Sequence, residues 1–415
     1  MSLTLGLYRA LMGLAEPLAP MLLARRAARG KEDPARIGER LGRAGIARPD
    51  GPLVWLHGVS VGETLSLLAL IDRIHAERPD LAILITSGTV TSASLLDRRL
   101  PPGVIHQYAP VDGPAATARF IAHWRPDLGI LAESDLWPNL ITTARASGAK
   151  LALVSARLTE KSASGWARRP GAARTLLGAF DLILPQDIET AGRLGALGVR
   201  SGPLLNLKLL GAPLPFDADE LKHLMATAKG RQIVIAASTH PGEDEIIASA
   251  VPPGLLLVII PRHPERGPAI ASAITATGRA VTRRAAGQPL SAANDLYVAD
   301  TLGEMGLFMR LADLVILGGS LVPGIGGHNP LEPARLGAPT ISGPYVHKNA
   351  ELFADMARSG AVMIAQPADL PSAVARLMTD ASARGDLAGA GLAYAKHQSG
   401  AFEEGWALIR PLLPA

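Results

Sequence analysis

Short apolar runs alternate with stretches of helical periodicity from residue 51 onward. Runs of three to six residues that are mostly apolar and bounded by Gly, Pro or polar turn residues predict buried strands. In the first half these runs are Leu53–Leu56, Leu81–Ile85, Leu128–Leu131, Leu151–Val154 and Leu182–Leu184. Helical stretches such as Thr64–Ala76 and Asn139–Ser147 lie between them. This alternation predicts βαβ units and a parallel sheet that is covered by helices.

A second series of the same kind follows the Gly- and Pro-rich stretch Gly202–Pro215. Its predicted strands are Ile233–Ala236, Leu255–Ile260, Asp295–Val298, Leu314–Leu317 and Pro339–Ile341. We therefore expect two doubly wound halves, and a terminal helix over Phe402–Leu413 that crosses back onto the first half. The predicted division is a leading helix at 1–30, a first domain at 31–207, a second domain at 208–395 and the terminal helix at 396–415.

The leading segment has the character of a membrane-surface element. Leu3–Leu23 is mostly apolar, but Arg9, Glu16 and two prolines interrupt it, and Arg25, Arg26, Arg29 and Lys31 follow it. A signal peptide has its charges before the apolar run, and a span needs about 20 predominantly apolar residues. Arg9 and Glu16 share one helix face, opposite the Leu and Met residues. This favours a helix lying in the membrane interface, with a helix docked on the domain as the main alternative and a true span as a weaker one.

Composition narrows the classes of function. The chain has 415 residues, 48% of them hydrophobic, and a formal net charge of +4, which excludes a disordered polymer. The absence of cysteine excludes a disulfide scaffold, an iron–sulfur protein and a Cys-based zinc site. Only eight of the 41 basic residues are lysine, and arginine favours bidentate contacts with phosphates and carboxylates. Nucleic acid is not an expected partner, because few aromatic residues are interleaved with the basic ones.

Chemistry is expected in the loops that follow strands, because ligands of such sheets bind outside the carboxyl ends of the strands. The loop Trp55–Thr64 contains two glycines and a serine, and a helix begins near Glu63. A carboxylate there can act as a general base, or it can simply complement the helix dipole. The loop after the third predicted strand carries Glu133, Asp135 and Trp137. Glu133 is a candidate for influencing the charge at a reacting centre, and Trp137 is a candidate for one wall of the acceptor pocket. The alternative is that Asp135 is an ordinary turn residue and that Trp137 packs in the core.

Two loops of the second half suit a phosphate-bearing ligand. Prolines stiffen the loop Pro261–Arg266, so that Arg262 can be aimed at an anion. In Gly318–Pro333, glycines let the backbone approach a phosphate, and a helix is expected to start at Asn329. Glu332, in the first helical turn, is placed to accept hydrogen bonds from ribose hydroxyls. The chain lacks a P-loop, a G-x-G-x-x-G turn after its first strand, and the H-E-x-x-H or H-x-x-E-H spacing of a metal site. A Ser-His-Asp hydrolase is not expected either, because no G-x-S-x-G elbow between a strand and a helix is assigned.

Taken together, these segments resemble the 3-deoxy-D-manno-octulosonic acid (Kdo) transferases of lipopolysaccharide assembly. The matching segments occur in the family's order and extend over nearly the whole chain. They are the leading apolar segment with its basic tail, Trp55–Thr64, Glu133–Asn139, Ser238–Glu245, Pro261–Arg266 and Gly324–Pro333. The resemblance implies a GT-B fold, in which two Rossmann-like halves face a cleft and the second holds most of the nucleotide sugar. It also implies transfer of Kdo from CMP-Kdo to a lipid A precursor of lipid IVA type, at the cytoplasmic face of the inner membrane, with inversion and without a metal ion or other cofactor.

The resemblance also implies roles for particular residues. Glu63 matches the general base, and Glu133 and Lys208 match positions that stabilise the transition state. A cation at Lys208 would offset the negative charge that grows on the departing CMP phosphate. Around Lys208 the chain departs from the family, which more usually has Gly-Asn-Leu-Lys where Leu205-Asn206-Leu207-Lys208 stands here. The CMP-contacting positions are Pro261, Arg262, Gly303, Glu304, Met305, Asn329, Pro330, Leu331 and Glu332, and Gly326 and Gly327 are expected to form a phosphate loop.

Two other functions stay open at this stage. One is a GT-B transferase that uses a UDP-sugar. The other is a two-lobed binding module that is tethered to a membrane and has no catalytic activity.

Overall fold

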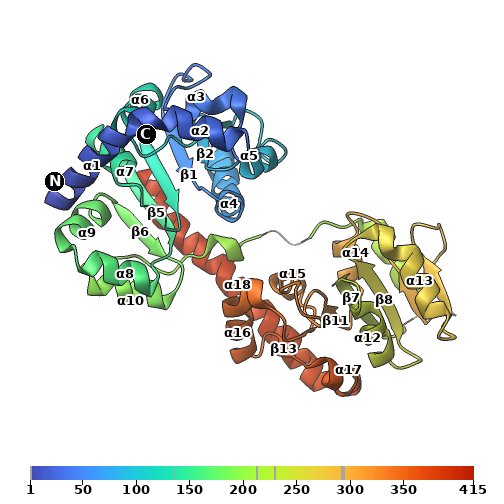
Figure 1. Cartoon of the computed structure of the whole chain (residues 1–415). Coiled ribbons are helices and arrows are strands. Elements are labelled where there is room, and N and C mark those ends of the chain that lie inside the picture. Colours follow the sequence, from blue (N-terminus) through green and yellow to red (C-terminus); the bar gives the residue numbers. More distant parts are fainter. Residues whose placement is uncertain (1, 135, 212–213, 229, 291–294) are drawn as a thin grey trace. The chain divides into compact units, whose positions relative to one another are not determined.

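The computed structural model describes residues 2–134, 136–211, 214–228, 230–290 and 295–415. The chain divides into two compact units (Figure 1). Unit 1 consists of Met1–Gly211 together with Gln398–Ala415, and unit 2 of Ala212–His397. The sequence had suggested boundaries after residues 207 and 395. Each unit has its own parallel sheet and its own apolar core.

The sheet of unit 1 has the strand order β3-β2-β1-β4-β5-β6, and every neighbouring pair is parallel. The strands are β1 (Leu53–His57), β2 (Ala82–Ser87), β3 (Ile105–Tyr108), β4 (Leu128–Ala132), β5 (Lys150–Ala156) and β6 (Leu182–Pro185). Residues of β1 and β4 are all buried, as expected for strands with helices on both faces. The direction of winding changes between β1 and β4, and this switch point is where doubly wound sheets bind ligands.

Helices cover both faces of this sheet (Figure 1). They are α4 (Val61–Glu77), α5 (Val90–Leu96), α6 (Pro114–Trp124), α7 (Pro138–Ala146), α8 (Glu160–Ala167), α9 (Pro170–Leu177) and α10 (Ile188–Ala196). On one face, Leu67 and Ile71 of α4 share a core with Trp406 and Ile409 near the end of α18 (Ala381–Ile409). On the other face, Trp55 packs edge-on against Phe120.

The leading segment forms α1 (Leu3–Ala15) and α2 (Ala19–Ala27) on either side of a short 3-10 turn at Glu16–Leu18, followed by the short α3 (Ile37–Arg40). The Glu16 carboxylate accepts hydrogen bonds from the N–H groups of Ala115 and Ala116 at 2.9 and 2.6 Å, so it caps α6. The Tyr8 hydroxyl donates to Asp112 at 2.9 Å. The segment is therefore docked on unit 1. None of the helices in the described part of the chain combines the length and the apolar character needed to cross a membrane.

The sheet of unit 2 has the order β13-β12-β11-β7-β8-β10-β9, again with parallel neighbours. Its strands are β7 (Ile233–Thr239), β8 (Leu256–Pro261), β9 (Val281–Arg283), β10 (Leu296–Val298), β11 (Leu314–Leu317), β12 (Thr340–Ser342) and β13 (Met363–Ile364). The helices are α11 (Ala218–Ala228), α12 (Glu243–Ala250), α13 (Gly267–Thr275), α14 (Met305–Met309), α15 (Leu331–Arg335), α16 (Ala350–Arg358), α17 (Leu370–Thr379) and most of α18. Its switch point lies between β7 and β11.

Candidate active site

Glu63 lies in the first turn of α4, at the carboxyl end of β1. Ser60 is the N-cap residue: its Oγ accepts the Glu63 N–H at 3.4 Å and donates to Glu63 Oε1 at 2.6 Å. The Val59 N–H donates to Glu63 Oε2 at 2.7 Å. This arrangement is a variant of the capping box, in which Glu63 accepts the N–H of the residue before the N-cap, so Glu63 does stabilise the helix terminus. The Glu63 side chain is only partly buried, so its place in the cap is compatible with contact to a ligand.

The same loop has the sequence G-x-S-x-G at Gly58–Gly62, the pattern of a serine-hydrolase elbow, so the expectation that the chain lacks this pattern is wrong. The structure does not support a nucleophilic serine. Ser60 has φ −91° and ψ 167°, which is ordinary extended backbone, whereas an elbow serine sits on a strained turn. Its hydroxyl is bonded to a carboxylate rather than to a histidine. Nearby His57 is fully buried and bonded to Thr86, and burial lowers its pKa to about 4, although Glu63 opposes the shift.

Glu133 and Lys208 form an ion pair at the carboxyl ends of β4 and β5. Lys208 Nζ lies 2.6 Å from Glu133 Oε1; the carboxylate side chain is 8% exposed and the lysine 44%. Glu133 has φ 60°, and Ser155 at the end of β5 has φ 48°. The Ser155 hydroxyl accepts the Leu207 N–H at 2.9 Å, which anchors the segment that carries Lys208. Two non-glycine residues in left-handed backbone carry a strain of about 1–3 kcal/mol each, and such strain gathers at functional sites.

The structure brings the three residues predicted to be catalytic to one end of one sheet. A Cβ atom built on Gly62 would lie 3.7 Å from Lys208 Cε, so the lysine stem runs beside the helical turn that carries Glu63. Trp137, also in the loop after β4, is 40% exposed, so the alternative of a core tryptophan is wrong, and its role as a pocket wall stays a prediction. Asp135 lies outside the described residues.

In unit 2, the charge of Arg262 acts on the Glu332 carboxyl group, although 70 positions separate the two residues in the chain. Pro261 ends β8 and is buried, and Arg262 after it is exposed. Burial raises the pKa of Glu332, and the charges of Arg335 and Arg262 oppose that shift. Asn329, Pro330 and Leu331 form the start of α15, where the Asn329 Oδ1 atom accepts the Leu331 N–H at 3.0 Å.

The segment Gly303–Met305 follows β10 and begins α14. Gly303 has φ 85°, a left-handed conformation that favours glycine. The Glu304 carboxylate accepts from Arg284 at 2.6 and 3.1 Å and also from the Thr301 hydroxyl. These bonds hold the pKa of Glu304 below its usual range. The Glu304 side chain therefore fixes the conformation of the segment instead of standing free.

Gly326 and Gly327 are constrained by a neighbouring segment. They have φ 102° and 81°. A Cβ on Gly326 would lie 2.8 Å from His347 Nε2, and one on Gly327 would lie 3.0 Å from Val346. The Gly327 N–H already donates to the Gly319 carbonyl at 2.7 Å. These glycines are thus required by a close approach of two loops, and their role as a phosphate loop stays a prediction.

Glu243, at the start of α12, is a structural residue of the site that was not predicted from the sequence. This carboxylate is completely buried and accepts N–H groups from the loop after β11: Gly319 at 2.7 Å, Ser320 at 2.9 Å and Leu321 at 2.8 Å. It also accepts the His240 N–H at 2.9 Å. One buried anion therefore ties together the loops after β7 and β11. The sequence offered one sign of Glu243, an acidic residue in Ser238–Glu245. That segment contributed to the family resemblance, but none of its residues was assigned a role.

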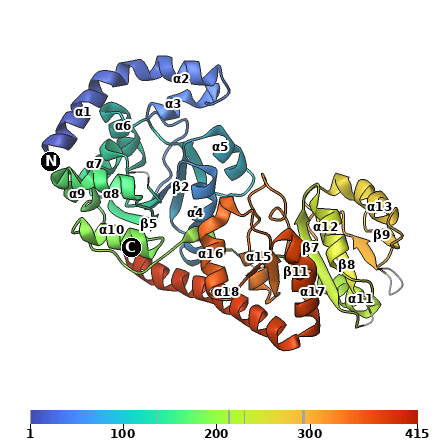
Figure 2. The same cartoon turned by 60° about the horizontal axis from the view of Figure 1, so that its bottom comes forward.

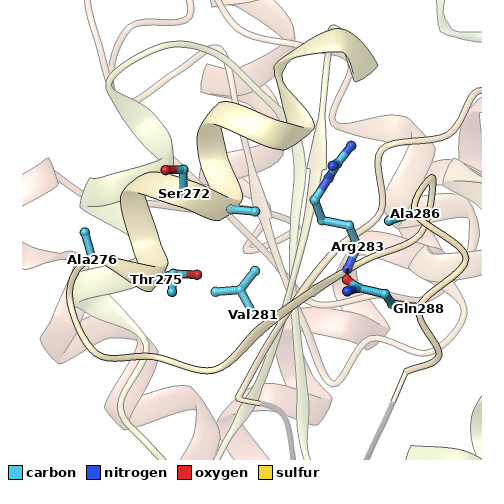
Figure 3. Close-up of a pocket in the computed structure, with 8 residues that line it drawn as sticks. Ser272, Thr275, Ala276, Val281, Arg283, Ala286 and Gln288 are labelled. Carbon is cyan, nitrogen blue, oxygen red and sulfur yellow. Dashed lines mark hydrogen bonds between the residues drawn. The ribbon is translucent and has the colours of Figure 1, made fainter.

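A surface pocket of unit 2 lies elsewhere, between α13 and β9 (Figure 3). Its lining residues are Ala271, Ser272, Thr275, Ala276, Val281, Arg283, Ala286 and Gln288. None of them is a predicted site residue, and Arg283 is already paired with buried Asp300 at 2.6 Å. Among the described residues, no group of three or more His, Asp or Glu side chains is arranged to hold a metal ion.

Two Rossmann-like units in one chain define a GT-B glycosyltransferase fold. The solved structure of Anabaena Alr3699/HepE in complex with UDP is similar to 87% of this chain and 99% of its own, with a TM-score of 0.52 and 13% identity. At that identity the likeness concerns the fold alone.

Sequence relatives define the family. Residues 35–210 match the family model described as 3-deoxy-D-manno-octulosonic-acid transferase. The Kdo transferase of Bordetella pertussis is 36% identical over 88% of both chains, and that of Rickettsia bellii is 34% identical over 86% of both. The chain belongs to the 3-deoxy-D-manno-octulosonic acid transferase family, and it is a glycosyltransferase.

Proposed function

We propose that this protein transfers Kdo from CMP-Kdo to a hydroxyl group of a lipid A precursor, with inversion and without a metal ion. The observation that supports this most directly is the convergence of Glu63, Glu133 and Lys208 in a member of the Kdo transferase family. One partly buried carboxylate that is held in place, next to one partly exposed ammonium group, is a suitable set for a single displacement at a sugar carbon.

In the proposed reaction, the acceptor hydroxyl oxygen attacks the anomeric carbon of Kdo while its proton passes to the Glu63 carboxylate. The bond from that carbon to the phosphate oxygen breaks, and its electron pair leaves with CMP. A single displacement inverts the carbon. The Lys208 ammonium offsets the charge on the departing phosphate, and Glu133 sets the position of Lys208 through their 2.6 Å contact.

Unit 2 is proposed to hold the CMP moiety. Arg262 is exposed and supplies charge to the phosphate region, and Glu332 supplies acceptor oxygens for the ribose hydroxyls. The backbone of Gly303–Met305, fixed by the Glu304–Arg284 pair, completes the proposed contacts.

Incubation with CMP-Kdo and a lipid A precursor tests the function. We expect products heavier by one or more Kdo units in the mass spectrum, release of CMP, and turnover that survives a chelator. CMP at 100 times its Kd should stabilise the fold by about 2.7 kcal/mol, measured as a rise in Tm. Stabilisation by UDP in place of CMP would favour the UDP-sugar transferase, and CMP binding without any turnover would favour the binding module.

We further propose that unit 1 lies on the cytoplasmic face of the inner membrane through α1 and α2, which run along its surface (Figure 2). Seven large apolar residues of this segment are about half exposed or more: Leu3, Leu7, Leu11, Leu14, Leu18, Met21 and Leu22. Their spacing of three or four residues places them on one side of a helical path. Arg25, Arg26 and Arg29 follow and are exposed, which suits an anionic lipid surface.

Replacing Leu7 and Leu14 together by glutamate should weaken binding to vesicles that contain anionic lipid. Burial of a leucine side chain contributes about 1.5–3 kcal/mol, so we expect a loss of at least 100-fold in the partition coefficient, measured by co-sedimentation. Ile188→Glu is the matched control, because Ile188 is 77% exposed on α10 of the same unit. Equal sedimentation of the double variant and the control would contradict the proposal.

A further inference from the structure

Two histidines meet at the switch point of unit 2, and neither has been given a role above. His240 follows β7 and His328 lies in the long loop after β11, 88 residues later in the chain. Their Nε2 atoms are 2.9 Å apart, and the rings are stacked at 14° with centroids 5.1 Å apart. The carboxyl ends of β7 and β11 are where a doubly wound sheet binds its ligand.

The surrounding structure holds this pair in place. The buried Glu243 carboxylate fixes the His240 backbone and the loop that begins at Gly319. Gly319 has φ 72°, and a Cβ there would lie 2.9 Å from His328 Cδ2, so the imidazole fills the space that a side chain would take. The His328 ring also hydrogen-bonds to the Ser238 backbone. These contacts fix both rings before any ligand binds.

Cationic groups surround the pair. Burial lowers the pKa of His328 to about 4, and His240, Arg262 and Lys348 add to the effect. Burial also lowers the pKa of His240; His263, Arg266 and Arg262 act in the same direction and Glu243 opposes them. His263 itself lies 3.7 Å from Glu265. In the absence of an anion the pair is uncharged near neutral pH, and it stands in a field that favours a negative ligand.

We propose that the His240–His328 pair binds the sugar carboxylate of the donor. This inference rests on the proposed function, because it concerns the carboxylate group of the Kdo sugar in CMP-Kdo. An octulosonic acid attached to CMP presents a carboxylate in addition to the phosphate. The nucleotide contacts predicted for Arg262 and Glu332 account for CMP but leave the carboxylate without a partner of its own.

The hydrogen-bonding pattern suits that ligand. When the His328 ring donates to the Ser238 carbonyl, its Nε2 is an acceptor, so the shared Nε2 proton belongs to His240. The His240 Nδ1 atom is then an acceptor in the neutral pair. On uptake of one proton it becomes a charged donor that can bind a carboxylate. The subsite therefore couples donor binding to protonation of the pair.

Glutamine variants test the inference. His240→Gln and His328→Gln should each raise the KM for CMP-Kdo at least tenfold. The Kd for CMP, measured by calorimetry, should change less than threefold, because CMP has no sugar carboxylate. His223→Gln is the matched control, since His223 is exposed on α11 of the same unit and has no role in the site. Tm values report whether each variant is folded. If His328→Gln unfolds, His240→Gln still tests the inference, because His240 is only partly buried.

The pH dependence gives an independent readout. Because the carboxylate-bound pair takes up a proton, donor binding weakens as pH rises, so the wild-type KM for CMP-Kdo should increase from pH 5.5 to 8. The Kd for CMP should not follow that slope, and His328→Gln should flatten the slope for CMP-Kdo.

Three results would overturn the inference in distinguishable ways. An equal loss of CMP and CMP-Kdo binding in the variants would assign the pair to the nucleotide phosphate. If the folded variants had an unchanged KM for CMP-Kdo, the His240–His328 pair would contribute only to packing. Absence of wild-type turnover with CMP-Kdo would refute the proposed function itself and the subsite with it.

Discussion

Glu63→Gln is expected to lower kcat for Kdo transfer by about 10²–10⁴-fold, the range for loss of a general base. Glutamine has nearly the same shape, and its Oε1 atom can still accept one of the two bonds now made by the Val59 N–H and the Ser60 hydroxyl. What it cannot do is take a proton from the acceptor hydroxyl. The Kd for CMP and the Tm should therefore remain close to the wild-type values. Single-turnover assays with CMP-Kdo measure the chemical step directly.

Ser60→Ala separates catalysis from capping. It removes the hydroxyl that caps α4 and binds Glu63 Oε1, so we expect a loss of about 1 kcal/mol in the free energy of unfolding. Its kcat should fall much less than that of Glu63→Gln, because the base remains. If both variants lost stability and kept most of their activity, Glu63 would be a capping residue and the base would lie elsewhere.

The sequence predicted the central strands of both sheets because they are buried on both faces and are therefore continuously apolar. It missed β3, β9 and β13, which are all edge strands. Edge strands are shorter or more polar, as Ile105-His106-Gln107-Tyr108 illustrates. It also started the terminal helix too late: α18 begins at Ala381, but its Ala- and Gly-rich first half has no apolar stripe to mark it. The leading helix was predicted as one piece, and prolines 17 and 20 accompany its division into two.

The candidate site shows a similar limit. Glu63 and Glu133 were proposed as site residues because they stand in segments that resemble family motifs, and Lys208 because the lysine is kept where the surrounding segment departs from the family. The ion pair between Glu133 and Lys208, and the approach of Lys208 to the helical turn that carries Glu63, depend on the register between strands that are distant in the sequence. No local sequence pattern encodes that register. Glu243 and the His240–His328 pair escaped attention for the same reason: a buried carboxylate that binds four backbone N–H groups has no signature in sequence beyond one acidic letter.

Lys208→Met is expected to lower kcat by about 10²–10³-fold, comparable to the loss of one preorganised group that stabilises a developing anion. Methionine keeps the length of the stem beside Gly62 and removes the charge. Because Lys208 is 44% exposed, water can replace it at Glu133, so the free energy of unfolding should fall by only about 1 kcal/mol. Lys150→Met is the matched control, since Lys150 is exposed at the amino end of β5 in the same sheet.

A double-mutant cycle with Glu133→Gln tests whether Glu133 acts through Lys208. If the carboxylate only positions the ammonium group, the double variant should be about as slow as Lys208→Met alone, because the second change removes a partner that is already gone. Multiplicative losses would instead show that Glu133 acts on the sugar directly, as a separate stabiliser of positive charge at the anomeric carbon. Retention of wild-type kcat in Lys208→Met, with CMP release unchanged, would contradict the proposed role of the lysine.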